Sequence, residues 1–137
     1  MTGFNELIGQ HRQIRWLTTA VNNDTAPQAI LFSGQAGVGK KTAAVDFAMA
    51  ANCEHRHARR PGSENAYGSA CGHCRCCKKI VSGNHPDFHH VFPSGAYIRI
   101  DQVRALCRTL TLKPYEAAVR VVLISDAHQM NAEAGNA

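Results

Sequence analysis

A short apolar run that leads directly into a glycine-rich loop is the feature that most narrows the folds open to this chain. Residues 29–32 (Ala-Ile-Leu-Phe) have the composition of a buried parallel strand, and residues 34–40 (Gly-Gln-Ala-Gly-Val-Gly-Lys) follow almost at once. The alanine-rich residues 41–52 then favour a helix. Strand, glycine loop and helix in this order predict backbone N–H groups directed at phosphate oxygens, beside the positive end of a helix dipole.

The loop departs from the usual pattern at one position. The residues expected to meet a nucleotide are Gly34, Gly37, Gly39, Lys40, Lys41 and Thr42. A Ser or Thr should follow the Gly-Lys pair, because its hydroxyl binds Mg²⁺. Lys41 occupies that position, and Thr42 comes one residue later, about 100° further round the helix. We therefore expect binding of ATP and Mg²⁺ to be weak or absent; the alternative is a glycine-rich turn with no ligand.

The acidic motif that should cooperate with the loop is also incomplete. Residues 119–124 (Val-Arg-Val-Val-Leu-Ile) are the strongest strand signal in the chain, and Ser125 and Asp126 follow. Hydrolysing proteins with such loops end a strand in an acid that holds the metal, often with a second acid that orients water. Ser125 stands in the first position, so we predict a degenerate second acidic motif and an inefficient ATPase. Asp126 alone has a second interpretation, as a neutral cap.

Four cysteines have the spacing of a metal site. Cys71, Cys74 and Cys77 form Cys-x₂-Cys-x₂-Cys, which lets a tight turn place thiolates about 2.3 Å from one tetrahedral ion. Cys53 supplies a fourth ligand by loop closure. Four protein ligands fill the tetrahedron, so the sequence predicts a structural rather than a catalytic zinc. Residues 53–80 are polar and poor in large apolar side chains, which is typical of an insertion folded around metal.

Several alternatives remain open at these cysteines. Cys76 could replace Cys77 as a ligand, and His55, His57 or His73 could replace Cys53. Reduced structural cysteines without metal are a further interpretation. Disulfides are disfavoured, because nothing at the N-terminus resembles an export signal.

The rest of the chain completes an α/β pattern. Residues 10–22 space apolar side chains as a helix does, and residues 88–92 favour a strand. Asp101 is the expected N-cap of a further helix whose apolar face would bury Cys107. Alternating strands and helices predict a parallel sheet with helices on both faces.

Composition adds little about partners. The net charge of +5 falls to about +3 if four thiolates hold one Zn²⁺, so basicity is weak support for direct DNA binding. No apolar run approaches the length of about 20 residues needed to cross a bilayer, and we expect a cytoplasmic protein with no membrane partner.

Together these motifs resemble the N-terminal domain of bacterial DNA polymerase III clamp-loader subunits, which belong to the AAA+ family. Residues 4–10 (Phe-Asn-Glu-Leu-Ile-Gly-Gln) are similar to the start of such domains, and the cysteine pattern follows the helix as it does there. The resemblance implies an AAA+ sheet with a zinc insertion at about 53–80. In that family the fourth strand separates the first from the third, so 88–93 and 119–124 should pair in parallel, and 28–33 should not pair with 119–124.

Three places favour the delta-prime kind over the gamma/tau motor. Residues 83–87 (Gly-Asn-His-Pro-Asp) with Pro93 are similar to delta-prime, and the motor keeps Gly-Lys-Thr where this chain has Lys41. The motor's two acids fall on Ser125 and Asp126. The resemblance implies a non-hydrolysing stator that contacts gamma/tau and delta subunits and helps place a sliding clamp on primed DNA.

The resemblance also sets expectations for what lies beyond Ala137. Asn136 and Ala137 resemble the start of a helix within the family's first domain, so we expect a partial domain without lid, collar or the downstream arginine finger. The alternatives are a gamma/tau-type ATPase motor and a zinc-dependent nucleic-acid-binding module. No catalysis by this chain alone is expected, although the holoenzyme it would serve is a nucleotidyltransferase.

Overall fold

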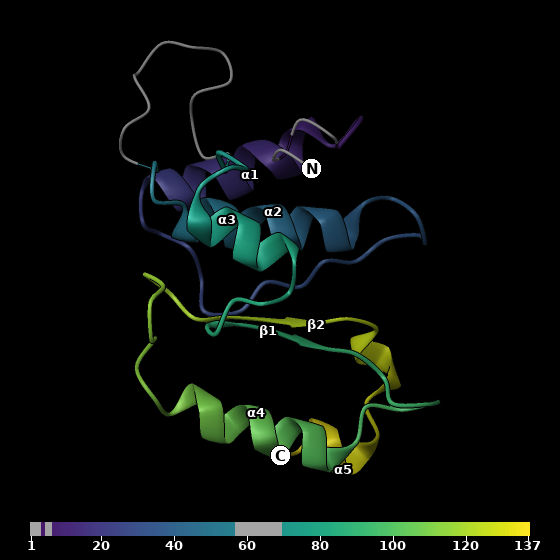
Figure 1. The fold of residues 1–137 in the computed structure, drawn as a ribbon. Helices are drawn as coiled ribbons and strands as arrows, with labels where there is room; N and C mark the ends of the chain where they lie inside the picture. The colour runs from purple at the N-terminus through teal and green to yellow at the C-terminus, as the bar shows by residue number, and fades with distance from the viewer. Residues whose placement is uncertain (1–3, 5–6, 57–69) are drawn as a thin grey trace. The chain divides into compact units, whose positions relative to one another are not determined.

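The computed structural model describes residues 4, 7–56 and 70–137, which divide into two compact units, Met1–Asn84 and His85–Ala137. The first unit contains α1 (His11–Asn22), α2 (Lys40–Asn52) and α3 (Arg75–Val81), and the second contains β1 (Phe88–Val91), α4 (Ile100–Leu110), β2 (Val121–Ile124), the 3₁₀ turn η2 (Ala127–Gln129) and α5 (Ala132–Gly135) (Figure 1). Within the described ranges, no helix combines the length and apolar character that a bilayer crossing requires.

Small side chains build the core of the first unit. The predicted helices at 10–22 and 41–52 are confirmed as α1 and α2. Leu17 and Val21 of α1 pack with Ala43 and Ala50 of α2 and with Phe4. Alanine keeps its helix propensity while letting a neighbouring backbone approach closely, so α2 buries several faces at once. Helix α3 lies beside α2 (Figure 1).

The predicted strand at 28–33 is wrong as a strand. These residues form no strand in the structure, and the described part of the first unit contains no other strand with which they could pair. Ile30 and Phe32 instead pack against the helical core, while Leu31 is 84% exposed. The side chains of this segment still alternate between buried and exposed, because that alternation comes from packing against the helices. A hydrogen-bonded ladder would in addition require a neighbouring strand.

The second unit is organised around a two-stranded parallel sheet. Strand β1 pairs with β2 in the register Phe88↔Val121 to Val91↔Ile124, which confirms the predicted parallel pairing of these segments. Figure 1 shows the two strands side by side, with α4 in the crossover between them. A crossover helix is the usual way to join parallel strands.

Two boundaries of the second unit and the burial of one cysteine differ from expectation. Helix α4 has Arg99 at its N-cap position, and Asp101 lies in its first turn; Gln102 caps by accepting a hydrogen bond from the Arg99 N–H at 3.0 Å. Strand β2 begins at Val121, two residues later than predicted, because Arg120 is drawn into an ion pair. Cys107 is exposed, and no residue of α4 is fully buried.

The ion pair joins Arg120 to the carboxylate of Asp87, just before β1. Asp87 is fully buried and accepts hydrogen bonds from the backbone N–H groups of Tyr115, Glu116 and Ala117 at 2.8–3.0 Å. The Arg120 guanidinium lies 2.9 Å from the same carboxylate and also donates to the carbonyls of Leu112 and Lys113, at 2.7 and 2.9 Å.

This contact network connects the start of β1, the residues after α4 and the start of β2. Burial opposes the charge on Asp87, but the three backbone N–H groups and the guanidinium outweigh it and hold the pKa of this carboxyl well below its ordinary value of 3.8. The buried charge is therefore a folding constraint on the second unit.

Replacing Asp87 with Asn should destabilise the second unit severely. The substitution leaves the guanidinium and several N–H donors without a carboxylate in a buried site, a loss of about 3 kcal/mol or more. The control Asp101→Asn changes an exposed carboxylate in the first turn of α4 and should cost under about 1 kcal/mol. Urea unfolding of the two variants measures both; equal losses would show that the Asp87 network contributes nothing special.

The same carboxylate makes stability depend on acid pH. Its pKa is lower in the folded than in the unfolded chain, so its stabilisation is complete above the unfolded value and is lost as the pH falls below it. The free energy of unfolding of the natural chain should therefore fall between about pH 5 and about pH 2, and fall less in Asp87→Asn. Parallel acid-dependent curves for the two proteins would contradict this assignment.

Candidate functional site

The glycine loop adopts a conformation that only glycine takes readily. Gly34, Gly37 and Gly39 have φ angles of 143°, 82° and 90°, which lie in the region that side chains disfavour. Gly39 is the N-cap of α2, so the loop delivers the chain directly to the helix N-terminus. Backbone N–H groups at such a terminus can meet an anion.

Two lysines begin the helix in different environments. Lys40 folds back on the loop, where its Nζ donates to the carbonyls of Gly34 and Gln35, at 2.7 Å in each case. Lys41, in the position of the metal-binding hydroxyl, is exposed, and Thr42 is half-buried on the next face of the helix. The loop and the start of α2 therefore offer cationic groups and backbone donors. The Thr42 hydroxyl comes one residue after the position expected for a metal ligand.

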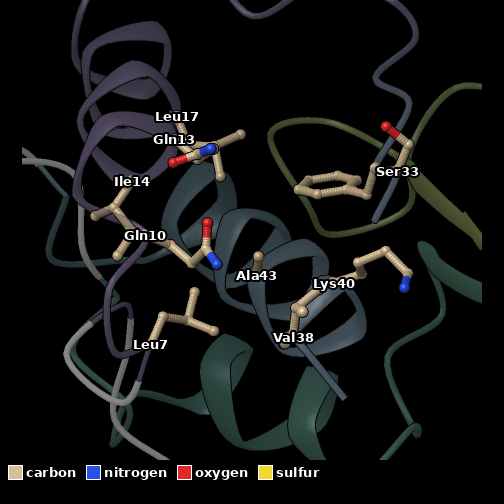
Figure 2. Close-up of a pocket in the computed structure, with 11 residues that line it drawn as sticks. Leu7, Gln10, Gln13, Ile14, Leu17, Ser33, Val38, Lys40 and Ala43 are labelled. Carbon is tan, nitrogen blue, oxygen red and sulfur yellow. The ribbon is translucent and has the colours of Figure 1, made fainter. Parts of the chain in front are cut away.

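Two cavities adjoin the loop. One, of about 90 Å³, is bounded by Leu7, Gln10, Ile14 and Leu17 on one side and by Val38, Lys40 and Ala43 on the other (Figure 2). The second, of about 460 Å³, is lined by Leu7, Ile8, Gln10, Gly37, Val38, Gly39 and Thr42. Only the larger one falls within the range of about 300–1,000 Å³ that small-molecule sites occupy. Among the residues that the structure describes, neither lining contributes a carboxylate.

Ser125 and Asp126 lie in the second unit, directly after β2. The Ser125 hydroxyl lies 2.8 Å from Nε2 of His90 on β1, and its backbone N–H donates to Val91 at 2.9 Å. Asp126 is exposed and adopts a left-handed conformation with φ of 52°, at the start of η2. The glycine loop belongs to the first unit, whereas Ser125 and Asp126 belong to the second.

The structure brings the four predicted metal-binding cysteines together. The Sγ atoms of Cys53, Cys71, Cys74 and Cys77 all lie within 4.8 Å of one another. A tetrahedral ion with sulfur ligands at about 2.3 Å needs sulfur atoms about 3.8 Å apart, so a small contraction completes the site. Cys53, Cys74 and Cys77 are buried and Cys71 is half-buried, so the cluster could hold a metal ion away from bulk water.

Backbone donors orient the sulfur atoms. The N–H groups of Cys71, Cys74 and Cys77 donate to the sulfur atoms of Cys53, Cys71 and Cys74, at 3.5, 3.2 and 3.4 Å respectively. The last of these bonds caps α3, because Cys74 is its N-cap residue. The cysteine-bearing turn and the start of the helix are therefore one local structure.

The thiols differ in their acidity. Burial opposes ionisation of Cys71, but backbone hydrogen bonds from Cys74 and His73 outweigh it and lower the pKa of Cys71 to about 6. Burial raises the pKa of Cys53 and, together with a hydrogen bond to Cys74, that of Cys77. Without a cation, the cluster thus favours a thiolate at the half-buried Cys71.

The structure also separates the alternative ligands. Cys76 is buried but stands outside the four-sulfur cluster, and its backbone N–H donates to Glu54 at 3.3 Å. His55 and His73 gather around Cys71 and not at the position of Cys53. His57 lies outside the described residues.

Three features escaped prediction from the sequence. Helix α3 lies within the stretch interpreted as an insertion folded around metal, and its N-cap is Cys74, a residue type that does not ordinarily mark a helix start. The partnership of His90 with Ser125 needs the strand register, which no local pattern specifies. The sequence analysis used Asp87 only as part of a resemblance, and its burial depends on the backbone N–H groups of residues 115–117 and on Arg120, which no local pattern specifies.

Comparison with known proteins gives the family. A family model described as "DNA polymerase III, delta subunit" matches residues 9–137. The chain belongs to this family. Membership confirms the predicted relationship to the subunits of the DNA polymerase III clamp loader and to DNA replication.

Two kinds of DNA polymerase III subunit are similar to this chain. It is 37% identical over 132 residues to subunit delta' of Bacillus subtilis, which covers 96% of this chain and 36% of the relative. Subunit delta' of Pseudomonas aeruginosa is 36% identical over 111 residues, covering 80% and 31%. Subunit tau/gamma of Haemophilus influenzae is 30% identical over 134 residues, covering 98% and 18%. The chain therefore spans about a third or less of the length of these relatives.

Gly37 and Gly39, on either side of Val38, provide a test of how the glycine loop packs. An added Cβ at Gly39 would lie 2.5 Å from Cδ2 of Leu7, whereas one at Gly37 would meet nothing within 4 Å. Both substitutions to Ala incur the left-handed backbone cost of about 1–2 kcal/mol. Gly39→Ala should cost roughly 1 kcal/mol more than Gly37→Ala, because Leu7 must leave its place against the core. Urea unfolding measures the difference; equal costs would contradict the close contact.

Proposed function

We propose that this chain belongs to a delta-prime-type clamp-loader subunit that assembles with gamma/tau and delta subunits without hydrolysing ATP itself. The proposal rests mainly on the position of Lys41. This residue places an exposed cation at the helix position where a hydrolysing loop carries the hydroxyl that binds Mg²⁺. The higher identity to two delta' subunits than to the tau/gamma subunit supports the same choice.

A second departure strengthens the proposal independently. Ser125, where the motor would carry its metal-binding acid, has a hydroxyl engaged with His90. A serine hydroxyl hydrogen-bonded to a histidine is a poor Mg²⁺ ligand, because this cation prefers carboxylates, phosphates and water. In the proposed role this AAA+ domain contacts neighbouring subunits in the cytoplasm, and the assembled loader acts on the sliding clamp and primed DNA.

We propose that Cys53, Cys71, Cys74 and Cys77 hold one structural Zn²⁺. The mutual approach of four sulfur atoms supports this choice, since a closed set of four thiolates is typical of structural zinc. Among its described residues, 53–56 and 70–80, the segment around them buries few large side chains, Ile80 among them, so metal binding would supply much of its folding free energy. When bound, the ion would hold the residues around Cys53 and the start of α3 to one another.

The zinc proposal predicts about one zinc per purified chain. Cys74→Ser should lose most of the metal and lower hydrogen-exchange protection in α3. Cys107→Ser changes an exposed cysteine outside the cluster, and Cys76→Ser changes a buried neighbour; both should keep their zinc. Elemental analysis and hydrogen exchange provide the measurements. Loss of zinc in Cys76→Ser with retention in Cys77→Ser would move the fourth ligand to Cys76.

The clamp-loader proposal predicts no turnover by the protein alone. The full-length protein with Mg²⁺ and ATP should release phosphate at the background rate, and Lys41→Thr should not restore activity, because Ser125 still lacks a carboxylate. Added to gamma/tau and delta subunits of the same organism, it should complete an assembly that loads the clamp. Turnover by the isolated protein that disappears in Lys40→Ala would instead favour the gamma/tau motor.

A further inference from the structure

A second group of metal-ligand atoms adjoins the four cysteines. One ring nitrogen each of His55 and His73 and the sulfur of Cys71 lie within 4.8 Å of one another. Both histidines are exposed, and their rings stack with centroids 5.6 Å apart and planes inclined by 26°. The group therefore faces water on the accessible side of the cluster.

His73 is already held as a metal-ligating histidine is. Its Nδ1 lies 2.8 Å from the carbonyl oxygen of Cys71. A carbonyl can only accept, so Nδ1 must carry the proton in this bond, and the neutral ring keeps its lone pair on Nε2. A second nitrogen bound to a backbone carbonyl is the usual support of a histidine that binds metal.

We propose that His55, His73 and Cys71 form a second, exposed position for a borderline-soft divalent cation such as Zn²⁺, with Cys71 shared between the two positions. The inference rests on the proposed four-thiolate zinc site. One Zn²⁺ held by four thiolates leaves a local charge of −2, which attracts a further cation. Cys71 is the least buried of the four sulfur ligands, and its sulfur is the one that lies near the ring nitrogens of both histidines.

The geometry needs only small adjustments. Ligands at about 2.0–2.1 Å for nitrogen and 2.3 Å for sulfur would stand roughly 3.3–3.6 Å apart around a tetrahedral ion. The two histidines lie in turns at the surface, where rotation of an exposed ring can close the remaining distance. Imidazole with thiolate suits zinc and cobalt rather than magnesium or calcium, and water would take the fourth place.

Cobalt titration of the zinc-loaded, untagged chain tests the proposal. The zinc content is measured first, and Co²⁺ is then added while the visible absorption of tetrahedral cobalt and the retained zinc are followed. The natural chain should take up one Co²⁺ and keep its zinc. The double variant His55→Gln/His73→Gln should keep the zinc and lose the cobalt signal, and the single variant His73→Gln should weaken cobalt binding at least about tenfold.

The matched control is His11→Gln, which removes an exposed histidine from α1 in the same unit and should leave cobalt uptake unchanged. Cobalt uptake that persists in the double variant, or that releases an equal amount of zinc, overturns the second position. A zinc-loaded chain that takes up no cobalt overturns it too, while the four-cysteine site stands. A chain purified with no zinc overturns both.

Discussion

The buried charge of Asp87 holds the second compact unit together. Its carboxylate is satisfied by backbone donors from residues 115–117 and by Arg120, so the residues before β1 are tied to a segment about 30 positions further along the chain. The Asp87 carbonyl also accepts the first hydrogen bond of β2, from Val121 at 2.9 Å. The register of the sheet, and with it the position of Ser125 beside His90, follows from this contact.

The first unit is stabilised by different interactions. Its helices meet through alanines, which allow close packing but bury little apolar area per residue. The cysteine cluster lies where α2 ends and α3 begins, and the sulfur of Cys74 caps α3. A unit with so modest a core would gain much from the cross-link that the proposed metal ion supplies among four sulfur atoms.

The glycine loop keeps the backbone geometry of a phosphate-binding loop but differs in the side chains that follow it. The left-handed glycines and the helix N-terminus remain, so the backbone can still adopt the form that cradles phosphate. Lys40 is bonded to the loop's own carbonyls, and Lys41 replaces the hydroxyl.

Local patterns in the sequence determined the helices α1 and α2, the two strands and the cysteine set. Each of these signals is short-range: apolar periodicity, β-branched runs and Cys-x₂-Cys spacing act over a few residues. Only the tertiary structure decided that residues 28–33 form no strand, that Arg120 leaves β2 for Asp87, and that His55 and His73 gather at Cys71. Those outcomes depend on which distant groups become neighbours, because a ladder, a buried ion pair and a shared ligand each require a partner that local sequence does not specify.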